Sequence, residues 1–531
     1  IEMCGIFSYN GKKYNWSQLN KEFDKISYRG PDNSHYEDIS GNVLFGFHRL
    51  AIMGISDSGN QPMSHPEDES LTLICNGEIY NYLDIAKKYH FDLKTGSDSE
   101  IILHLYKKIG IEKTINELDG VFMFVLYDAK SDLILASRDP MGVRPGFIGK
   151  KEGEVFIASE AKAIMQFCDE VIPFPPGTWW SSKNIDQHNR YFNYNSEKIN
   201  ESSEKLICDK INKLLIDAVK KRLMSERDIG CLLSGGLDSS LITSIVSKYQ
   251  YENQLNTFSI GMQGSIDLEY SETVANYLNT KHHQIEISEN EFLEAIETVI
   301  YNIESYDTTT VRASVGNYLV SKYIKENTDC KVIFNGDGSD EVCCGYVYLK
   351  NSPSENELQK ESKRLVKELH YFDVLRSDRS ISSNGLEART PFLDKAFVKY
   401  YLSIPAELKE FDGVQRLEKH LLRKAFDNKD FLPKNVLWRR KCAFSDGVSS
   451  KNNSWHKIIQ NHIDKIITDK EFNELKDTYD HCPPQLKESY YYRKVFDSFF
   501  PNQHKLIPHF WMPKWTNVTD PSARELEEYS E

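Results

Sequence analysis

The sequence predicts an α/β protein with at least two domains, and three observations carry this prediction. The chain has 531 residues, a length that favours about two to four domains. Residues 230–233 read as a short buried strand, followed by a loop with two glycines and then a helix. Parallel α/β sheets bind nucleotides at such turns. In the first half of the chain, polar clusters lie between apolar, β-branched segments, which is typical of strands whose ends carry a site.

Composition excludes several classes of protein. With 40% hydrophobic and 27% charged residues, the chain is typical of soluble globular proteins, and its net charge of −14 argues against a nucleic-acid-binding surface over the whole molecule. The amino-terminal region has no apolar core of signal-peptide type, and residues 121–127, the longest clean apolar run, are too few to span a bilayer. The ten cysteines form no C-x-x-C pair, which favours reduced thiols over disulfides or a zinc site. We therefore expect a cytoplasmic protein that binds neither nucleic acid nor membrane.

The first half of the chain opens with Cys4 and continues with four polar clusters, at residues 29–32, 47–52, 76–81 and 97–100. In this order the clusters resemble the class II glutamine amidotransferases, which are amino-terminal-nucleophile hydrolases that release ammonia from glutamine. The resemblance implies an αββα sandwich. It continues through residues 118–122, 137–139, 142–145 and 159–162, which we expect to form strands of the same domain. Gly146 stands where this family usually has a larger apolar residue.

The resemblance also implies a role for each cluster. The Cys4 thiolate would attack the glutamine amide with its own α-amine as base, since an α-amine titrates near ~8 and a thiol near ~8.5. Asn76 and the Gly77 N–H would form the oxyanion hole. Arg49 would bind the α-carboxylate of glutamine and Asp98 its ammonium group. The remaining glutamine-binding positions are Leu50, Ala51, Ile52, Met53 and Glu78.

Each of these residues also has a purely structural interpretation. Asn76-Gly77 alone would be an ordinary hairpin turn, and Asp98 could cap the helix that begins near residue 101. The sequence also departs from the family at its start, because Met3 precedes Cys4. If Met3 stays attached, Cys4 has no free α-amine and the glutaminase should be inactive.

The boundary between the halves is expected at a polar, weakly periodic segment. We place a first domain at residues 4–187, a linker at 188–204 and a second domain at 205–531. Helical spacing resumes at about residue 206 and leads into the strand at 230–233. Further buried strands are expected at residues 255–261, from residue 282 and at 331–334. The adjacent pair His282-His283 would point to opposite faces of its strand, so we interpret both as structural.

The loop after residue 233 carries the string Ser-Gly-Gly-Leu-Asp-Ser-Ser. Gly235 and Gly236 let backbone N–H groups approach an anion, and the helix amino end favours negative charge. No lysine follows the glycines, so this is not a P-loop. A glycine-rich structural turn is the alternative. The whole string, however, resembles the pyrophosphate-binding loop of the ATP pyrophosphatases, which activate a substrate as an adenylate.

A glutaminase domain followed by such a loop resembles the glutamine-hydrolysing asparagine synthetases, and the resemblance covers nearly the whole chain. Further matching strings lie at residues 304–307, 311–314, 387–394, 418–423, 438–441, 444–447, 490–493 and 511–515. The implied reaction begins when the β-carboxylate of aspartate attacks the α-phosphorus of ATP, which gives β-aspartyl-AMP and pyrophosphate. Ammonia released at Cys4 then travels inside the protein and displaces AMP to give asparagine.

The same resemblance assigns the synthetase site. Lys419 would stabilise charge on the α-phosphate, and Asp337 would share in catalysis. Asp238 and Asp340 are the expected Mg²⁺ ligands. The candidates for binding aspartate or phosphate are Arg312, Glu341 and Arg389. The ATP-binding residues are Leu233, Ser234, Gly235, Gly236, Leu237, Asp238, Ser239, Ser240, Ile260, Asn335 and Gly336.

Two positions depart from the family in this site. Asp337 stands where Glu is usual, and Asn335 stands where Ser is usual. A carboxylate about one methylene shorter could slow adenylate formation or the ammonia step. Two other functions compete with the synthetase: a ring-closing enzyme of the β-lactam synthetase type, and a degenerate binding or regulatory copy. The intact Cys4, Asn76 and Asp98 argue against the first. The family also leads us to expect a homodimer.

Overall fold

The computed structural model describes residues 4–195, 197–201, 203–250, 254–441, 448–449 and 454–521. The chain divides into two compact units. Unit 1 contains Ile1–Asn193, and it also takes two short segments from the second half, Met224–Asp228 and Ile381–Ala388. Unit 2 contains Tyr194–Leu223, Ile229–Ser380 and Arg389–Glu531. The sequence pattern gave no sign of the two added segments, and the linker over 188–204 stays a prediction.

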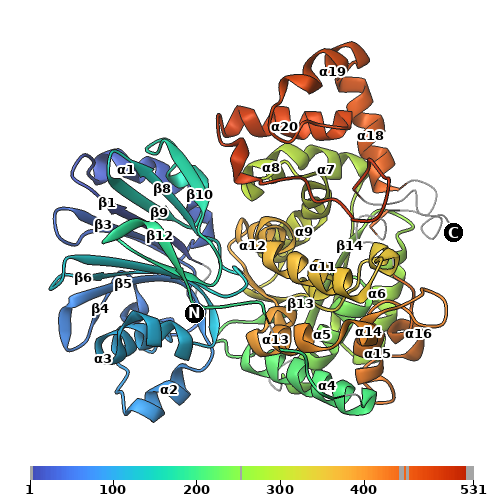
Figure 1. Cartoon of the computed structure of the whole chain (residues 1–531), viewed down its shortest axis with the longest axis horizontal. Helices are drawn as coiled ribbons and strands as arrows, with labels where there is room; N and C mark the ends of the chain where they lie inside the picture. Colours follow the sequence, from blue (N-terminus) through green and yellow to red (C-terminus); the bar gives the residue numbers. More distant parts are fainter. Residues whose placement is uncertain are drawn as a thin grey trace. The chain divides into compact units, whose positions relative to one another are not determined.

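Unit 1 is built on two six-stranded sheets (Figure 1), in the orders β10-β8-β9-β1-β3-β2 and β12-β11-β7-β6-β5-β4. Neighbouring strands in both sheets run antiparallel, as in the central pairs β1–β3 and β5–β6. The strands are β1 Gly5–Asn10, β2 Asn33–Asp38, β3 Val43–Arg49, β4 Met63–His65, β5 Asp68–Ile79, β6 Gly120–Asp128, β7 Leu133–Arg138, β8 Phe147–Lys151, β9 Glu154–Ala158, β10 Glu170–Pro173, β11 Thr178–Ser181 and β12 Asn184–Arg190.

The core of unit 1 lies between the two sheets. Alternate side chains of the first sheet, such as Phe45, pack there against those of the second, such as Val125. Helices α2 (Tyr82–Tyr89) and α3 (Glu100–Glu117) cover the outer face of the second sheet with an apolar layer of their own. Helix α1 (Trp16–Phe23) packs its aromatic side chains on Phe7 of the first sheet. The layers are helix, sheet, sheet, helix, which confirms the predicted αββα sandwich.

Asn76 and Gly77 lie inside the long strand β5, paired with β6, so the alternative interpretation of this pair as a hairpin turn does not hold. Some other local expectations in unit 1 were wrong. Residues 142–145 form a loop, and the segment at 159–162 leads into a 3-10 turn over Ala161–Ala163 rather than a strand. Residues 184–190, which read as weakly periodic, form strand β12. The structure explains why glycine stands at position 146 instead of the larger residue usual in the family, because a Cβ there would overlap the Met123 side chain.

The second half of the chain contains a five-stranded sheet in the order β15-β14-β13-β16-β17. Strands β13 (Ile229–Leu232), β14 (Asn256–Gly261), β15 (Lys281–Glu286) and β16 (Val332–Phe334) are parallel, and Glu387–Arg389 form β17. The parallel strands confirm the predicted α/β sheet because all four lie at the expected positions. Crossing helices cover them, since parallel neighbours need long connections.

The helices of the second half are shown in Figure 1, where α5 and α6 lie beside the sheet. Those that carry the site are α5 Leu237–Tyr249, α6 Ile266–Leu278, α9 Thr308–Asn327, α10 Ser339–Val342, α12 Asp373–Ser382, α15 His420–Phe426 and α20 Lys487–Phe499. The others are α4 Glu204–Lys221, α7 Glu289–Glu294, α8 Ile296–Ile303, α11 Glu355–Glu368, α13 Lys395–Ser403, α14 Ala406–Lys409, α16 Lys434–Leu437, α18 Trp455–Ile466 and α19 Asp469–Leu475.

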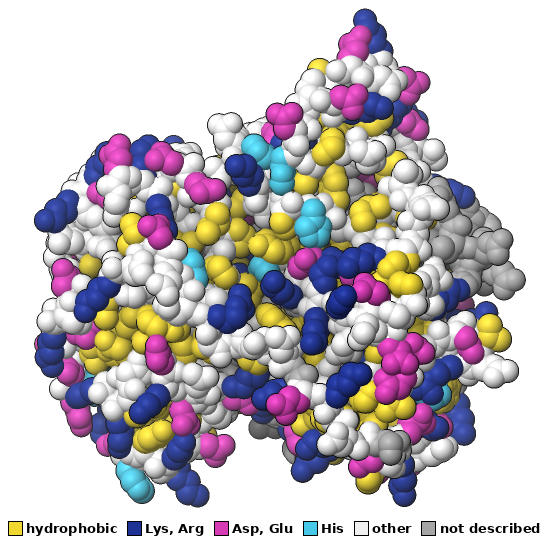
Figure 2. All heavy atoms as spheres, viewed as in Figure 1, with side chains coloured by type: hydrophobic (Ala, Val, Ile, Leu, Met, Phe, Trp, Pro, Cys, Tyr) yellow, Lys and Arg dark blue, Asp and Glu magenta, His cyan; other side chains and the backbone are white. Residues whose placement is uncertain are grey.

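The remaining sequence predictions concern the surface and the thiols. Figure 2 shows acidic and basic side chains interspersed on the face in view. The nine cysteines of the described ranges form no disulfide with one another, and Cys343 and Cys344 are buried. Cys442 and the matching string at 444–447 lie outside the described residues, as does Met3. Within the described part of the chain, no helix has both the length and the apolar character needed to cross a bilayer.

Candidate functional site

The glycine-rich loop of unit 2 joins β13 to α5. Gly235 adopts φ +75°, and a Cβ there would overlap Tyr270 and the backbone N of Ser271. This left-handed, crowded position requires glycine. The loop is closed by its own hydroxyls, because the Ser239 Oγ lies 3.0 Å from the Ser234 Oγ and accepts the Ser234 N–H at 3.2 Å. The amino end of α5 therefore points its first N–H groups toward the loop.

A second loop, at residues 335–338, lies against the first. A Cβ on Gly336 would stand 2.8 Å from atoms of Asp238 and Ser239, so glycine allows the close approach. The Ser339 Oγ donates to the Asp238 Oδ1 at 2.8 Å and ties the two loops together. Both loops follow parallel strands, β13 and β16, whose carboxyl ends share one edge of the sheet.

Charged side chains converge where the loops meet. The Lys419 Nζ lies 2.6 Å from the Asp238 Oδ2 and 2.6 Å from the Asp340 Oδ1. Lys441 pairs with the same Asp340 oxygen. Although burial alone would raise the pKa of Asp340, the two lysines hold it well below its ordinary range. Burial opposes the charge of Lys419, but the two carboxylates raise its pKa above the ordinary value. Asp340 and Lys419 are therefore both ionised at neutral pH.

Asp337 faces a different cation. Its Oδ1 lies 2.9 Å from a terminal nitrogen of Arg376, which also pairs with Asp373. Burial raises the pKa of Asp337, Arg376 lowers it and Asp373 raises it, with a net upward shift. The Asn335 amide, which replaces the usual hydroxyl, donates to the Ser377 Oγ at 2.8 Å. Both departures from the family pattern thus have partners on helix α12.

These groups line one cavity of about 330 Å³ in unit 2. Of the predicted residues, the loop residues and the charged candidates are on its wall: Ser234, Gly236, Leu237, Asp238, Ser239, Arg312, Asn335, Gly336, Asp337, Asp340, Glu341 and Lys419. Five others are not among the lining residues: Leu233, Gly235, Ser240, Ile260 and Arg389. Arg389 is buried and donates to the carbonyl oxygen of Arg222, so it supports the fold beside the cavity.

The candidate nucleophile of unit 1 lies at the start of β1. Cys4 is fully buried, and its N–H donates to the Asn76 Oδ1 at 2.9 Å. The Asn76 Nδ2 is buried without a hydrogen-bond partner among the described residues, as expected for a donor that awaits a substrate oxygen. A Cβ on Gly77 would overlap the backbone of Val121 and Phe122, so the neighbouring position also requires glycine.

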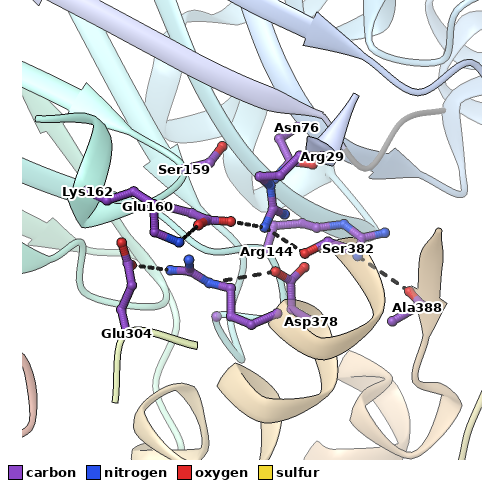
Figure 3. A network of polar contacts seen from close by, with 12 residues as sticks. Arg29, Asn76, Arg144, Ser159, Glu160, Lys162, Glu304, Asp378, Ser382 and Ala388 are labelled. Atoms are coloured by element: carbon purple, nitrogen blue, oxygen red, sulfur yellow. Dashed lines mark hydrogen bonds and ion pairs between the residues drawn. The ribbon is translucent and has the colours of Figure 1, made fainter. Parts of the chain in front are cut away.

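A buried ionic network supports the Cys4 backbone. The Arg29 Nε donates to the Cys4 carbonyl oxygen at 3.1 Å. The Arg29 Nη1 pairs with Glu160 at 2.8 Å and donates to the Ser382 Oγ at 2.9 Å (Figure 3). Lys162 lies on the other side of Glu160, at 2.7 Å. All three charged residues are fully buried. The strand that carries the nucleophile is therefore fixed at its carbonyl as well as at its amide.

The segment after β3 carries the predicted glutamine-binding residues. Arg49 donates to the carbonyl oxygens of Ser56 and Gly54 at 2.9 and 2.6 Å, so its guanidinium holds the loop of residues 54–60. The segment Met224–Asp228 supports the same loop, because the Glu226 N–H donates to the Ile52 carbonyl oxygen at 3.0 Å.

Two of the predicted glutamine-binding residues are carboxylates. Asp98 is buried and accepts the Ile79 N–H, and Glu78 is buried against Arg144 at 2.9 Å. Of the other predicted glutamine-binding residues, Leu50, Ala51 and Ile52 are buried and Met53 is half-buried.

Comparison with known proteins decides the family. A family model described as a glutamine amidotransferase domain matches residues 3–176, and one described as asparagine synthase matches residues 210–357 and 350–519. Glutamine-hydrolysing asparagine synthetases from Rattus norvegicus, Gallus gallus and Homo sapiens are 43%, 42% and 42% identical to the chain, with 99% of each chain covered. The chain belongs to the asparagine synthetase family.

Within this asparagine synthetase scaffold, several wall residues of the cavity were missed by the sequence reasoning. Lys441 stands in the matching string at 438–441. If every lysine in the matching strings had been considered alongside Lys419, Lys441 would have been a candidate as well. Asp373 and Arg376 carry no motif, since helix α12 brings them in from outside the glycine-rich loops. Other missed wall residues are Asp267, Thr309, Thr310, Tyr346, Glu418, Arg423, Arg439 and Trp511.

Proposed function

We propose that this protein makes asparagine from aspartate, ATP and the amide nitrogen of glutamine. The observation that carries the proposal is the convergence of the Ser-Gly-Gly loop, Lys419, Lys441 and Asp340 on one cavity, in a chain that matches asparagine synthetases over 99% of its length. The loop offers N–H groups to an anion and the lysines offer positive charge, the combination that phosphate transfer needs.

In unit 1, we assign glutamine hydrolysis to Cys4. Its thiolate would attack the amide carbon and form a thioester while ammonia leaves, and water would then release glutamate. The unpartnered Asn76 Nδ2 is the donor available to the oxyanion. The base would be the Cys4 α-amine, which exists only when residues 1–3 are absent. Arg49 and Asp98 would bind the two charged ends of the glutamine backbone.

In unit 2, we assign aspartate activation to the charged cavity. The aspartate β-carboxylate would attack the α-phosphorus, the bond to the bridging oxygen would break, and pyrophosphate would leave. Lys419 and Lys441 lie where they can neutralise charge on the phosphates. Ammonia would then attack the β-carbonyl carbon and release AMP. Arg376 and Asp337 line the same cavity, and we assign to this pair the orientation of the aspartate substrate or the uptake of a proton from the attacking ammonia.

Magnesium fits the same cavity. Among the described residues, no group of three or more His, Cys, Asp and Glu side chains could hold a metal ion. Two carboxylates, Asp238 and Asp340, do converge on one cationic nitrogen, that of Lys419. Mg²⁺ is commonly held by one or two carboxylates together with substrate phosphates, so these two residues are the proposed ligands. The ion would add positive charge to the triphosphate.

Two broader features of the protein are also proposals. We expect a homodimer, as in the family, and a cytoplasmic location, for which reduced cysteines and the composition are the supporting observations.

The deciding experiment is the intact mass and amino-terminal sequence of purified protein, followed by asparagine assays with glutamine or ammonium as donor. A chain that starts at Cys4 should use both donors. A chain that retains Met3 should use ammonium only. Asparagine from neither donor, in protein that still binds ATP, would contradict the proposal and favour the ring-closing or regulatory alternatives. Pyrophosphate release that requires aspartate is a test against both alternatives, because neither of them predicts it.

A further inference from the structure

Arg312 is held by two carboxylates at once. Its Nε and Nη2 donate to the two oxygens of Glu488 at 2.7 and 2.6 Å, and its Nη1 and Nη2 donate to the two oxygens of Asp520 at 2.9 and 2.8 Å. Arg312 lines the cavity and its side chain is 1% exposed. A guanidinium has five N–H groups, and four of them are used here.

The two carboxylates occupy different faces of the guanidinium. Glu488 takes the side that includes Nε, and it is fixed in turn by the Tyr492 hydroxyl, which donates to its Oε1 at 2.9 Å. Asp520 takes the end formed by Nη1 and Nη2. Only one anion can bind that end through two oxygens. A phosphate that binds Arg312 in the same manner must therefore replace Asp520, whereas Glu488 can stay.

The exposed fractions of the two side chains agree with the inference that Asp520 can leave Arg312 while Glu488 stays. Glu488 has 0% side-chain exposure and lies on helix α20, while Asp520 has 16% and lies in the last described segment of the chain. Removal of Glu488 would leave a buried arginine uncompensated, which is costly. Departure of Asp520 returns a carboxylate to water and also breaks its contact with the Gln460 amide at 3.5 Å, but Arg312 stays paired if another anion takes the place of Asp520.

Asp520 ends a segment that forms part of the cavity wall. We name residues 504–521 the C-terminal strap. Its backbone is tied to the segment before α9, since Tyr306 donates to the His504 carbonyl oxygen at 2.7 Å and the Trp511 N–H donates to Asp307 at 2.8 Å. Lys514 pairs with Glu361 at 2.7 Å. Trp511, Pro513 and Pro521 of the strap line the cavity.

We propose that Asp520 is an exchangeable occupant of Arg312, which gives way to the phosphates of the nucleotide. In the empty enzyme, Asp520 neutralises Arg312 and holds the end of the strap against the cavity. When ATP or pyrophosphate binds, two phosphate oxygens take the Nη1–Nη2 face and the end of the strap is released. Asp520 is thus a positioning residue, which acts through Arg312. This inference rests on the proposed function, because it assumes that the cavity binds the triphosphate.

The test compares pyrophosphate binding by the full chain with binding by Asp520→Ala, both by titration calorimetry. Loss of the competitor should tighten binding about three- to tenfold, the size expected of a partly exposed ionic pair. Lys514→Ala is the matched control, since it removes another ionic contact of the strap and leaves Arg312 and Asp520 in place. Its affinity should equal that of the unaltered chain. Asp520→Asn removes the charge at almost constant size and should shift the affinity in the same direction if Asp520→Ala does not fold.

Hydrogen exchange gives a second readout. Amides in the peptide of residues 511–521 should exchange faster when pyrophosphate is added to the unaltered chain, and they should already be fast in Asp520→Ala without it. Equal or weaker pyrophosphate binding by folded Asp520→Ala and Asp520→Asn, or slower exchange of the strap on binding, would overturn the inference. If the unaltered chain binds neither ATP nor pyrophosphate, the proposed function fails first, and that outcome is distinct from the others.

Discussion

At the scale of the single residue, Asp267 is a buried carboxylate in the cavity wall. Burial raises its pKa to about 7, and Arg439, whose guanidinium lies 3.6 Å away, lowers it only in part. An unfolded chain would titrate this carboxyl near ~3.9. Between these two pH values the folded state binds the extra proton, so the contribution of Asp267 to stability is complete below about pH 4 and lost as the pH rises toward 7.

Asp267→Asn should remove this pH dependence, because an amide stays neutral throughout. We expect the melting temperature of the variant, minus that of the unaltered protein, to rise by about 2 °C or more between pH 5 and pH 8. Differential scanning calorimetry at both pH values measures it. The constant cost of losing the Arg439 contact cancels in this comparison. A difference that is the same at both pH values would contradict the upward pKa shift.

Lys441 also makes a prediction at this scale. It pairs with Asp340 and donates to the Gly345 carbonyl oxygen at 3.2 Å, so it is held over the cavity. Lys441→Ala should reduce asparagine formation with ammonium by about 100-fold or more, since a preorganised cation is lost. Glutaminase activity should be unchanged. Lys434→Ala, at the exposed start of helix α16, is the control. Ammonium-dependent activity of Lys441→Ala close to that of the control would refute the assignment.

At the scale of the element, the short helix α10 and the turn after it bring acid and cation together. Gly345 ends this turn, and a Cβ there would overlap the Lys419 side chain and the Asp340 carboxylate. Gly345→Ala should therefore separate the pair and abolish most ammonium-dependent synthesis while the protein stays folded. Gly413→Ala is the matched control, because its Cβ would meet nothing within 4 Å although its φ of +77° makes it locally strained. Comparison of synthesis rates and circular dichroism distinguishes the collision from a general loss of stability.

Three strands that the sequence predicted share one property, which is a short apolar run before a glycine-rich or polar turn. This pattern located β13, β14 and β16, and apolar spacing located α4. It failed for β12, whose residues alternate weakly because the strand lies at the edge of its sheet and few of its side chains are buried. The hairpin turn that Asn-Gly alone would favour does not form, because Asn76 and Gly77 are paired with Met123 and Phe122 of β6.

The residues of the site also fall into those that the sequence could predict and those that it could not. Residues in loops that directly follow a strand, such as Ser234 and Asp340, could be predicted, since the chain order itself places them at the sheet edge. Arg376 and Asp520 could not, because tertiary packing alone brings helix α12 and the strap to the cavity. The sequence located the strings that contain Arg312 and Arg389. It could not predict which groups pair with these two arginines, because the partners come from distant parts of the chain.

At the scale of the whole molecule, the interleaving of the two units limits how the chain can be divided. Arg144 of unit 1 pairs with Glu78 and also lies 3.7 Å from Glu387, and Arg29 donates to the Ser382 Oγ. Glu387 and Ser382 belong to the segment Ile381–Ala388. A fragment ending at residue 193 lacks this segment and the segment Met224–Asp228, so two buried arginines lose partners and the loop after Arg49 loses a support.

We therefore expect the fragment of residues 4–193 to melt at a lower temperature than unit 1 does in the full chain, and to bind glutamine more weakly. Calorimetry and glutaminase assays measure both quantities. The full chain with Lys441→Ala serves as the reference, because its unit 1 is intact while its synthesis is impaired. A fragment as stable and as active as that reference would show that the two inserted segments are dispensable.

The same interleaving has a consequence for biogenesis. A ribosome finishes Asn193 about 200 residues before it finishes Ala388. At about 5–20 residues per second, the nascent glutaminase unit stays incomplete for about 10–40 s. During that time Arg144 lacks Glu387, and the strand that carries Cys4 lacks one contact of its supporting network. The first half of this protein therefore reaches its full stability only after a short piece of the second half has been synthesised.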